Sequence, residues 1–175
     1  GPLKGGAVVA VNAAGDIYDY ENGCKVAGLR ADDGKTFLDS EQLMLEKIDV
    51  QENKFVGNTT IGVVFTNARF DKTRLCKIAG MAHDGYARTI RPVHTSADGD
   101  SIYAVSLGDV VADQDAVGAL AARVMAKAIL RGVQAAEEGS RWIAKTAERS
   151  RKKPGAPGTE EGEATCEKIR NPIYM

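Results

Sequence analysis

The chain has 175 residues, of which 43% are hydrophobic and 27% are charged, and its formal net charge is −1. This composition is typical of a single soluble globular domain and excludes the fibrous class. The near-neutral charge gives no electrostatic reason to expect nucleic acid as a partner. The apolar runs are strand-sized, far shorter than the roughly 18 residues of a membrane-spanning helix, so no membrane partner is expected.

The first half of the chain reads as strands and turns. Ala7 to Val11 is a continuous apolar strand, and a second short strand runs from Ile17 to Tyr20. Asn22 and Gly23 mark a tight turn, because this pair tolerates positive φ, and a meander is the simplest arrangement. Asp39 or Ser40 is expected to cap a short helix that runs through Lys47. The β-branched segment from Thr59 to Thr66 is the strongest predicted strand.

Helical periodicity dominates the second half. Residues 71–89 carry apolar side chains at helical spacing, and a second helix is predicted for residues 114–139, after a strand from Ser101 to Leu107. Both helices are expected to cover one face of a mixed sheet. We therefore predict an α/β domain over residues 1–140, followed at 141–175 by a helical extension and a disordered charged tail.

The cysteines and the amino terminus bear on the cellular compartment and the processing of the chain. Cys24, Cys76 and Cys166 are odd in number and widely separated, so disulfides and zinc are not expected and a reducing cytoplasm fits best. Because Gly1 leads into a strand-like run within a few residues and no initiator Met precedes it, we expect a fragment or a processed piece.

Asn58 and Thr59 stand at a loop-to-strand junction, where a backbone bond can be both strained and accessible. If that bond were cut, Thr59 would carry a free α-amine, whose pKa of roughly 7.7 to 8 lets it act as a base at neutral pH. A threonine hydroxyl becomes an effective nucleophile beside such a base. The alternative is that Thr59 and Thr60 simply form the edge of a strand.

Other polar motifs give weaker signals. His83-Asp84 and His94 could belong to a Ser-His-Asp hydrolase, but the chain has no GxSxG segment, and the absence of HExxH spacing gives no support for a metal site. The segment from Asp98 to Asp100 could be a turn leading into the next strand, with glycine for the backbone and aspartate for side-chain-to-backbone bonds.

Three segments together resemble a known family. NTTIGVV at 58–64, MAHDGYARTIRPVHT at 81–95 and DGD at 98–100 are similar to the C-terminal half of the P1-type peptidases, a group of L-aminopeptidase/D-esterases, β-peptidyl aminopeptidases and nylon-oligomer hydrolases. The resemblance covers residues from about 5 to 135. It implies a four-layer αββα sandwich, here incomplete, oligomers of processed heterodimers, a peptide or small amide substrate and no cofactor.

The resemblance also implies a self-cleaving precursor whose new N-terminal residue is the nucleophile. The matching bond is Asn58–Thr59, with Thr59 as nucleophile. The acidic pair that orients the nucleophile in such enzymes matches Asp98 and Asp100.

Two further family positions lie near the start of the chain. The oxyanion residue in the family's VAVN segment matches Asn12, and the lysine of its KGG segment matches Lys4. Lys4 and Asn12 are separated here by a shorter stretch than in the family, and we expect the N-terminal half of the family fold, with a tyrosine of the oxyanion site, to be missing. These departures leave an alternative, a truncated non-catalytic paralogue that acts as a binding or structural module.

Overall fold

The computed structural model describes residues 1–48 and 58–151, and of residues 140–151 it describes only the helical backbone. The elements follow one another as β1 (Gly5–Ala10), β2 (Asp16–Tyr18), β3 (Lys25–Ala27), α1 (Ser40–Glu46), β4 (Ile61–Ala68), α2 (Lys72–Thr89), β5 (Ile90–Arg91), β6 (Ser101–Val110) and α3 (Gln114–Arg151). The chain is thus an α/β structure with a mixed sheet, as predicted. Within the described ranges, no helix combines the length and the apolar character needed to cross a membrane.

The main sheet has the strand order β1-β4-β6, with β1 antiparallel and β6 parallel to the central β4. A smaller sheet has the order β3-β2-β5. The predicted meander is therefore wrong in one respect, because β1 pairs with β4 and not with β2. The β2–β3 hairpin is present, and Gly23 in its turn has φ 75°, as expected of an Asn-Gly turn.

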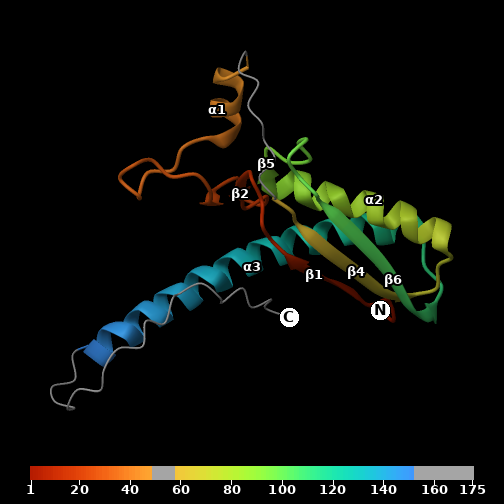
Figure 1. The fold of residues 1–175 in the computed structure, drawn as a ribbon. Helices are drawn as coiled ribbons and strands as arrows, with labels where there is room; N and C mark the ends of the chain where they lie inside the picture. Colours follow the sequence, from red (N-terminus) through yellow and green to blue (C-terminus); the bar gives the residue numbers. More distant parts are fainter. Residues whose placement is uncertain (49–57, 152–175) are drawn as a thin grey trace.

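Helices α2 and α3 pack on one face of the main sheet (Figure 1), with α2 next to β6 and α3 next to β1. Alternation along β4 turns Gly62, Val64, Thr66 and Ala68 toward the helices and leaves the other face of the strand open. The two helices approach closely at Gly85, where a methyl group would lie 2.5 Å from the Ala122 carbonyl oxygen. The core contains the fully buried Tyr86, Met125 and Ile129.

Local sequence signals explain where the helices begin. The side chain of Asp71 accepts the Arg74 N–H ahead of α2, and Asp39 does the same for Gln42 ahead of α1. Helix α3 begins at the predicted Gln114 and runs past residue 139 to Arg151, through the region where a helical extension is expected. The predicted disordered tail falls mainly on residues 152–175, which lie outside the described residues.

A buried carboxylate ties the segment between β2 and α1 to the domain. Asp16 is fully buried, and its Oδ2 accepts hydrogen bonds from Lys25 Nζ at 2.7 Å and the Ser40 N–H at 2.8 Å. Its Oδ1 accepts the Leu29 N–H at 3.0 Å and the Ser40 hydroxyl at 2.8 Å. Although burial raises the pKa of Asp16, the Lys25 ammonium and the N–H donors lower it on balance.

Candidate active site

The Asn58–Thr59 peptide bond lies just before β4, where backbone groups from two distant segments hold it. The Thr59 N–H donates to the Asn12 carbonyl at 3.0 Å, and the Gly99 N–H donates to the Asn58 carbonyl at 3.0 Å. Asn58 also forms an isolated parallel bridge with Asp98. Both polar groups of this peptide are therefore oriented from outside its own strand.

The side chain of Thr59 packs directly on the backbone of Gly99. Thr59 is half-buried, and a methyl group placed on the Cα of Gly99 would lie 2.6 Å from Thr59 Oγ1. That separation is far shorter than a van der Waals contact, so only glycine leaves the hydroxyl where it lies. The middle residue of the Asp-Gly-Asp segment is thus required by a close approach to Thr59.

The residue after Thr59 is fixed through both of its backbone polar groups. The Thr60 N–H donates to Asp100 Oδ1 at 2.9 Å, and its carbonyl accepts the Ser101 N–H at 3.1 Å and the Tyr86 hydroxyl at 3.2 Å. Burial raises the pKa of Tyr86, and the nearby negative charge of Asp100 acts in the same direction, so the hydroxyl stays protonated and can donate. Thr60 itself is fully buried.

The two aspartates of the Asp-Gly-Asp segment make different contacts. Asp98 Oδ2 accepts the N–H and the hydroxyl of Thr95, both at 2.8 Å, and so closes a turn. The Asp100 carboxylate instead reaches the backbone beside Thr59. Both aspartates lie next to the Asn58–Thr59 segment, because β4 and β6 are parallel neighbours and begin side by side.

Two histidines form a row that ends next to Asp100, and the sequence did not predict this contact. His83 on α2 and His94 in the following loop are 3.0 Å apart between Nδ1 and Nε2, and His94 Nε2 lies 3.8 Å from Asp100 Oδ2. Burial lowers the pKa of His83, and the neighbouring His94 acts in the same direction. The sequence places both histidines within residues 81–95, but their spacing does not predict that the two rings are in contact.

Asn12 and Lys4 lie at opposite ends of β1. The backbone carbonyl of Asn12 meets Thr59, whereas the Lys4 N–H donates to Asn67 Oδ1 at 2.7 Å, near the far end of β4. The antiparallel register, with Ala10 beside Ile61 and Gly5 beside Thr66, keeps these ends apart. The structure therefore brings Asn12 to Thr59 but does not bring Lys4 there.

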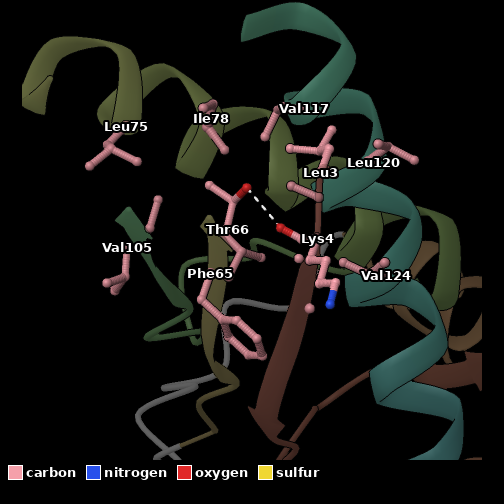
Figure 2. Close-up of a pocket in the computed structure, with 15 residues that line it drawn as sticks. Leu3, Lys4, Phe65, Thr66, Leu75, Ile78, Val105, Val117, Leu120 and Val124 are labelled. Atoms are coloured by element: carbon pink, nitrogen blue, oxygen red, sulfur yellow. Dashed lines mark hydrogen bonds between the residues drawn. The ribbon is translucent and has the colours of Figure 1, made fainter. Parts of the chain in front are cut away.

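A mostly apolar cavity of about 510 Å³ opens between the main sheet and the helices α2 and α3 (Figure 2). Figure 2 shows the Thr66 hydroxyl donating to the Lys4 carbonyl, a hydrogen bond of 3.1 Å, at one wall of this cavity. Its other walls include Leu75, Val117 and Val124. The cavity lies toward the end of β4 away from Thr59, so it does not adjoin the candidate nucleophile.

The site residues offer a hydroxyl, backbone N–H groups and a carboxylate. Across residues 1–48 and 58–139, whose side chains are described, no group of three or more His, Cys, Asp or Glu residues could hold a metal ion. The chemistry available here is nucleophilic attack by an oxygen on a carbonyl that a backbone N–H already contacts.

Comparison with known proteins decides the family. The model of peptidase family S58 matches residues 3–142. The chain belongs to this family. The P1-type resemblance is thereby confirmed.

The family's curated relatives are longer proteins. An uncharacterized aminopeptidase of Mycobacterium leprae (strain TN) is 35% identical over 147 residues, which cover 75% of this chain and 41% of the relative. A 6-aminohexanoate-oligomer endohydrolase of Kocuria sp. (strain KY2) is 30% identical over 144 residues, 73% of this chain and 40% of the relative. An enzyme of the same name from Paenarthrobacter ureafaciens is 36% identical over 87 residues, 42% of this chain and 24% of the relative. The chain spans less than half the length of these relatives.

Proposed function

We propose that this chain is an amide hydrolase of the N-terminal-nucleophile type that cuts its own Asn58–Thr59 bond. Membership of peptidase family S58, with relatives named aminopeptidase and oligomer endohydrolase, supports amide hydrolysis. The choice of bond rests on one observation, the hydrogen bonding of this peptide to Asn12 and Gly99 with Thr59 Oγ1 packed on Gly99.

In the self-cleavage step, Thr59 Oγ1 attacks the carbonyl carbon of Asn58 and its proton passes to the Thr59 nitrogen. The C–N bond breaks and an ester forms. Negative charge develops on the Asn58 carbonyl oxygen, which already accepts the Gly99 N–H. A donor aimed at a developing oxyanion is worth about 2.7 to 4 kcal/mol. Water then hydrolyses the ester, which leaves a carboxylate on Asn58 and a free α-amine on Thr59.

The new amine makes Thr59 its own general base, since its pKa of roughly 7.7 to 8 leaves a useful fraction neutral at physiological pH. Thr59 Oγ1 attacks the carbonyl of a peptide or small amide, and the amine takes the hydroxyl proton and passes it to the leaving nitrogen. Water releases the acyl group. Asn12 takes the oxyanion role that the family resemblance gives it, and Asp98 and Asp100 orient the nucleophile. The scheme uses no cofactor.

The open face of the main sheet supports the αββα part of this proposal. Side chains of Ile61, Phe65, Tyr103 and Leu107 on that face are exposed and apolar. Rows of this kind on a sheet usually pack against another layer. We propose that a second sheet covers this face in the complete enzyme, within a cytoplasmic oligomer of processed heterodimers.

N-terminal sequencing combined with intact mass tests the proposal. The purified chain is expected to yield two pieces, residues 1–58 and a fragment beginning at Thr59. Thr59→Ala removes the hydroxyl and should remain uncut, whereas the matched variant Thr59→Ser keeps a hydroxyl and should still be cut. Amide hydrolysis by the cut protein is then assayed with short peptides and aminohexanoate oligomers.

A single uncut species after long incubation would contradict the proposal. It would favour the second candidate, a truncated non-catalytic paralogue that serves as a binding or structural module. That candidate is supported by the position of Lys4, whose N–H donates to Asn67 Oδ1 at the end of β4 away from Thr59. Cleavage without hydrolysis of added amides would mean that substrate turnover requires parts of the relatives beyond this chain.

A further inference from the structure

His83, His94 and Asp100 form a row of polar side chains that ends on the backbone beside Thr59. His83 Nδ1 lies 3.0 Å from His94 Nε2, His94 Nε2 lies 3.8 Å from Asp100 Oδ2, and Asp100 Oδ1 accepts the Thr60 N–H at 2.9 Å. The first member lies on α2, the second in a loop and the third directly before β6. Side chains from three separate segments therefore connect α2 to the backbone beside Thr59.

The carboxylate of Asp100 needs more than one contact to keep its orientation. The torsion that turns a carboxylate is broad and roughly two-fold, so a single hydrogen bond to Oδ1 leaves the group free to rock. Its side chain is only 6% exposed, so little water reaches it. His94 stands on the Oδ2 side and limits that motion.

His83 in turn fixes the ring of His94. At 3.0 Å, one of the two facing ring nitrogens donates its N–H and the other accepts the hydrogen bond. This bond sets the plane of the His94 imidazole. Tyr86 adds an edge contact to His83, with ring centroids 5.3 Å apart, on the same turn of α2.

We propose that His83 and His94 are positioning residues that keep the Asp100 carboxylate on the Thr60 N–H and thereby hold Thr59 in place for attack. The inference rests on the proposed function, because the step it serves is cleavage of the Asn58–Thr59 bond. Neither histidine touches the reacting atoms. Their effect passes through Asp100.

Substitution of each histidine by glutamine or asparagine tests which ring nitrogen makes the contact. The terminal amide of glutamine reaches roughly the place of Nε2 of a histidine, and that of asparagine roughly the place of Nδ1. His94 acts through Nε2, so His94→Gln keeps the contact and His94→Asn loses it. His83 acts through Nδ1, so His83→Asn keeps the contact and His83→Gln loses it.

Backbone strain predicts the opposite order at His94. This residue has φ 57°, in the left-handed region, which asparagine adopts more readily than glutamine. If His94 mattered only for its backbone, His94→Asn would be the milder change. The order of the two variants therefore separates positioning from strain.

Two measurements on the full chain test the inference. The first is the rate at which the fragment beginning at Thr59 appears, and the second is hydrogen exchange of the Thr60 amide in an uncut Thr59→Ala background. We expect His94→Asn to slow cleavage by about 10-fold to 100-fold and to lower protection of the Thr60 amide. His94→Gln should stay close to the parent chain in both, and thermal melting identifies variants that fail to fold.

The outcomes separate the two proposals. If the parent chain is cut but His94→Gln and His94→Asn behave alike or in reversed order in both measurements, the positioning role is overturned while self-cleavage stands. If the parent chain is not cut but the Thr60 amide is protected in the predicted order, positioning of the Asp100 carboxylate stands and the proposed function falls.

Discussion

Replacing Gly99 with alanine should strongly slow self-cleavage without unfolding the protein. The added methyl group would lie 2.6 Å from Thr59 Oγ1, whereas ordinary contacts begin at 3.4 Å. The hydroxyl must therefore retreat by about 0.8 Å or rotate away. Because the nearest atom is the end of a side chain and not backbone, the fold can absorb the change by turning the Thr59 side chain.

Displacing the hydroxyl should lower the cleavage rate strongly and the stability of the fold only slightly. A misplacement of about 1 Å can slow an oriented reaction by roughly 100-fold. The other Thr59 atoms near the methyl group, Cγ2 and Cβ, lie at 3.5 and 3.6 Å, which is ordinary contact. We therefore expect the cleavage rate to fall about 100-fold while the melting temperature stays close to that of the parent chain.

Gly80 supplies a matched control on the exposed side of α2. A methyl group there meets nothing within 4 Å. Gly80→Ala should cleave at the parent rate and gain up to about 1 kcal/mol in stability, since alanine favours the helix. Both variants are followed by intact mass over time and by thermal melting.

Two results would refute the steric reasoning. Cleavage of Gly99→Ala at the parent rate, in a folded protein, would mean that the hydroxyl does not act from its observed place. Equal loss of cleavage and of stability would mean that Gly99 serves the fold and not the position of Thr59.

Three further changes test neighbouring contacts. Asp100→Asn keeps an oxygen for the Thr60 N–H but removes the charge, so cleavage should slow in the mass assay with unchanged circular dichroism, and the effect should exceed that of Asp98→Asn, whose parent carboxylate bonds Thr95. Tyr86→Phe removes the hydroxyl near the Thr60 carbonyl and should lower the free energy of unfolding in urea by about 1 kcal/mol. Asp16→Asn leaves the half-buried Lys25 ammonium without its counterion and should cost about 3 kcal/mol at pH 7. Because the pKa of Asp16 is lowered in the folded state, the stability it supplies is present above an unfolded pKa of about 3.9 and is lost as the pH falls through the folded value. A difference between parent and Asp16→Asn that is the same at pH 7 and pH 3 would contradict this explanation.

Local signals predicted the helices well. The spacing of apolar residues placed α2 within one residue, and the capping signal at Asp39 placed the start of α1, because both are properties of a single helical turn. The apolar stripe predicts a helix only to residue 139, and the helical extension expected after residue 140 is continuous with it in α3, which ends at Arg151.

Strand pairing could not be predicted from local pattern. The segment at β1 is apolar throughout, and an apolar pattern does not specify which strand it pairs with. The predicted meander therefore pairs it with the next strand in the sequence. Pairing of β1 with β4 depends on contacts more than fifty residues apart in the chain. Local pattern likewise does not predict the contact between His83 and His94. The separation of Lys4 from Thr59 follows from the register of β1 and β4, which was not predicted.

The gathering of Asn58, Thr59 and the Asp-Gly-Asp segment was anticipated only through the family resemblance. Its physical reason is the parallel pairing of β4 with β6, which places the starts of the two strands side by side. The catalytic roles of these residues remain predictions.

The pairing of β1 with β4 has a consequence for any nicked form of the molecule. Residues 1–58 contribute a strand that is paired over six positions with a strand of the other piece. After a break behind residue 58, the two pieces would stay associated through this strand pairing and would elute together in gel filtration. The nick would become visible only once a denaturant pulls the strands apart.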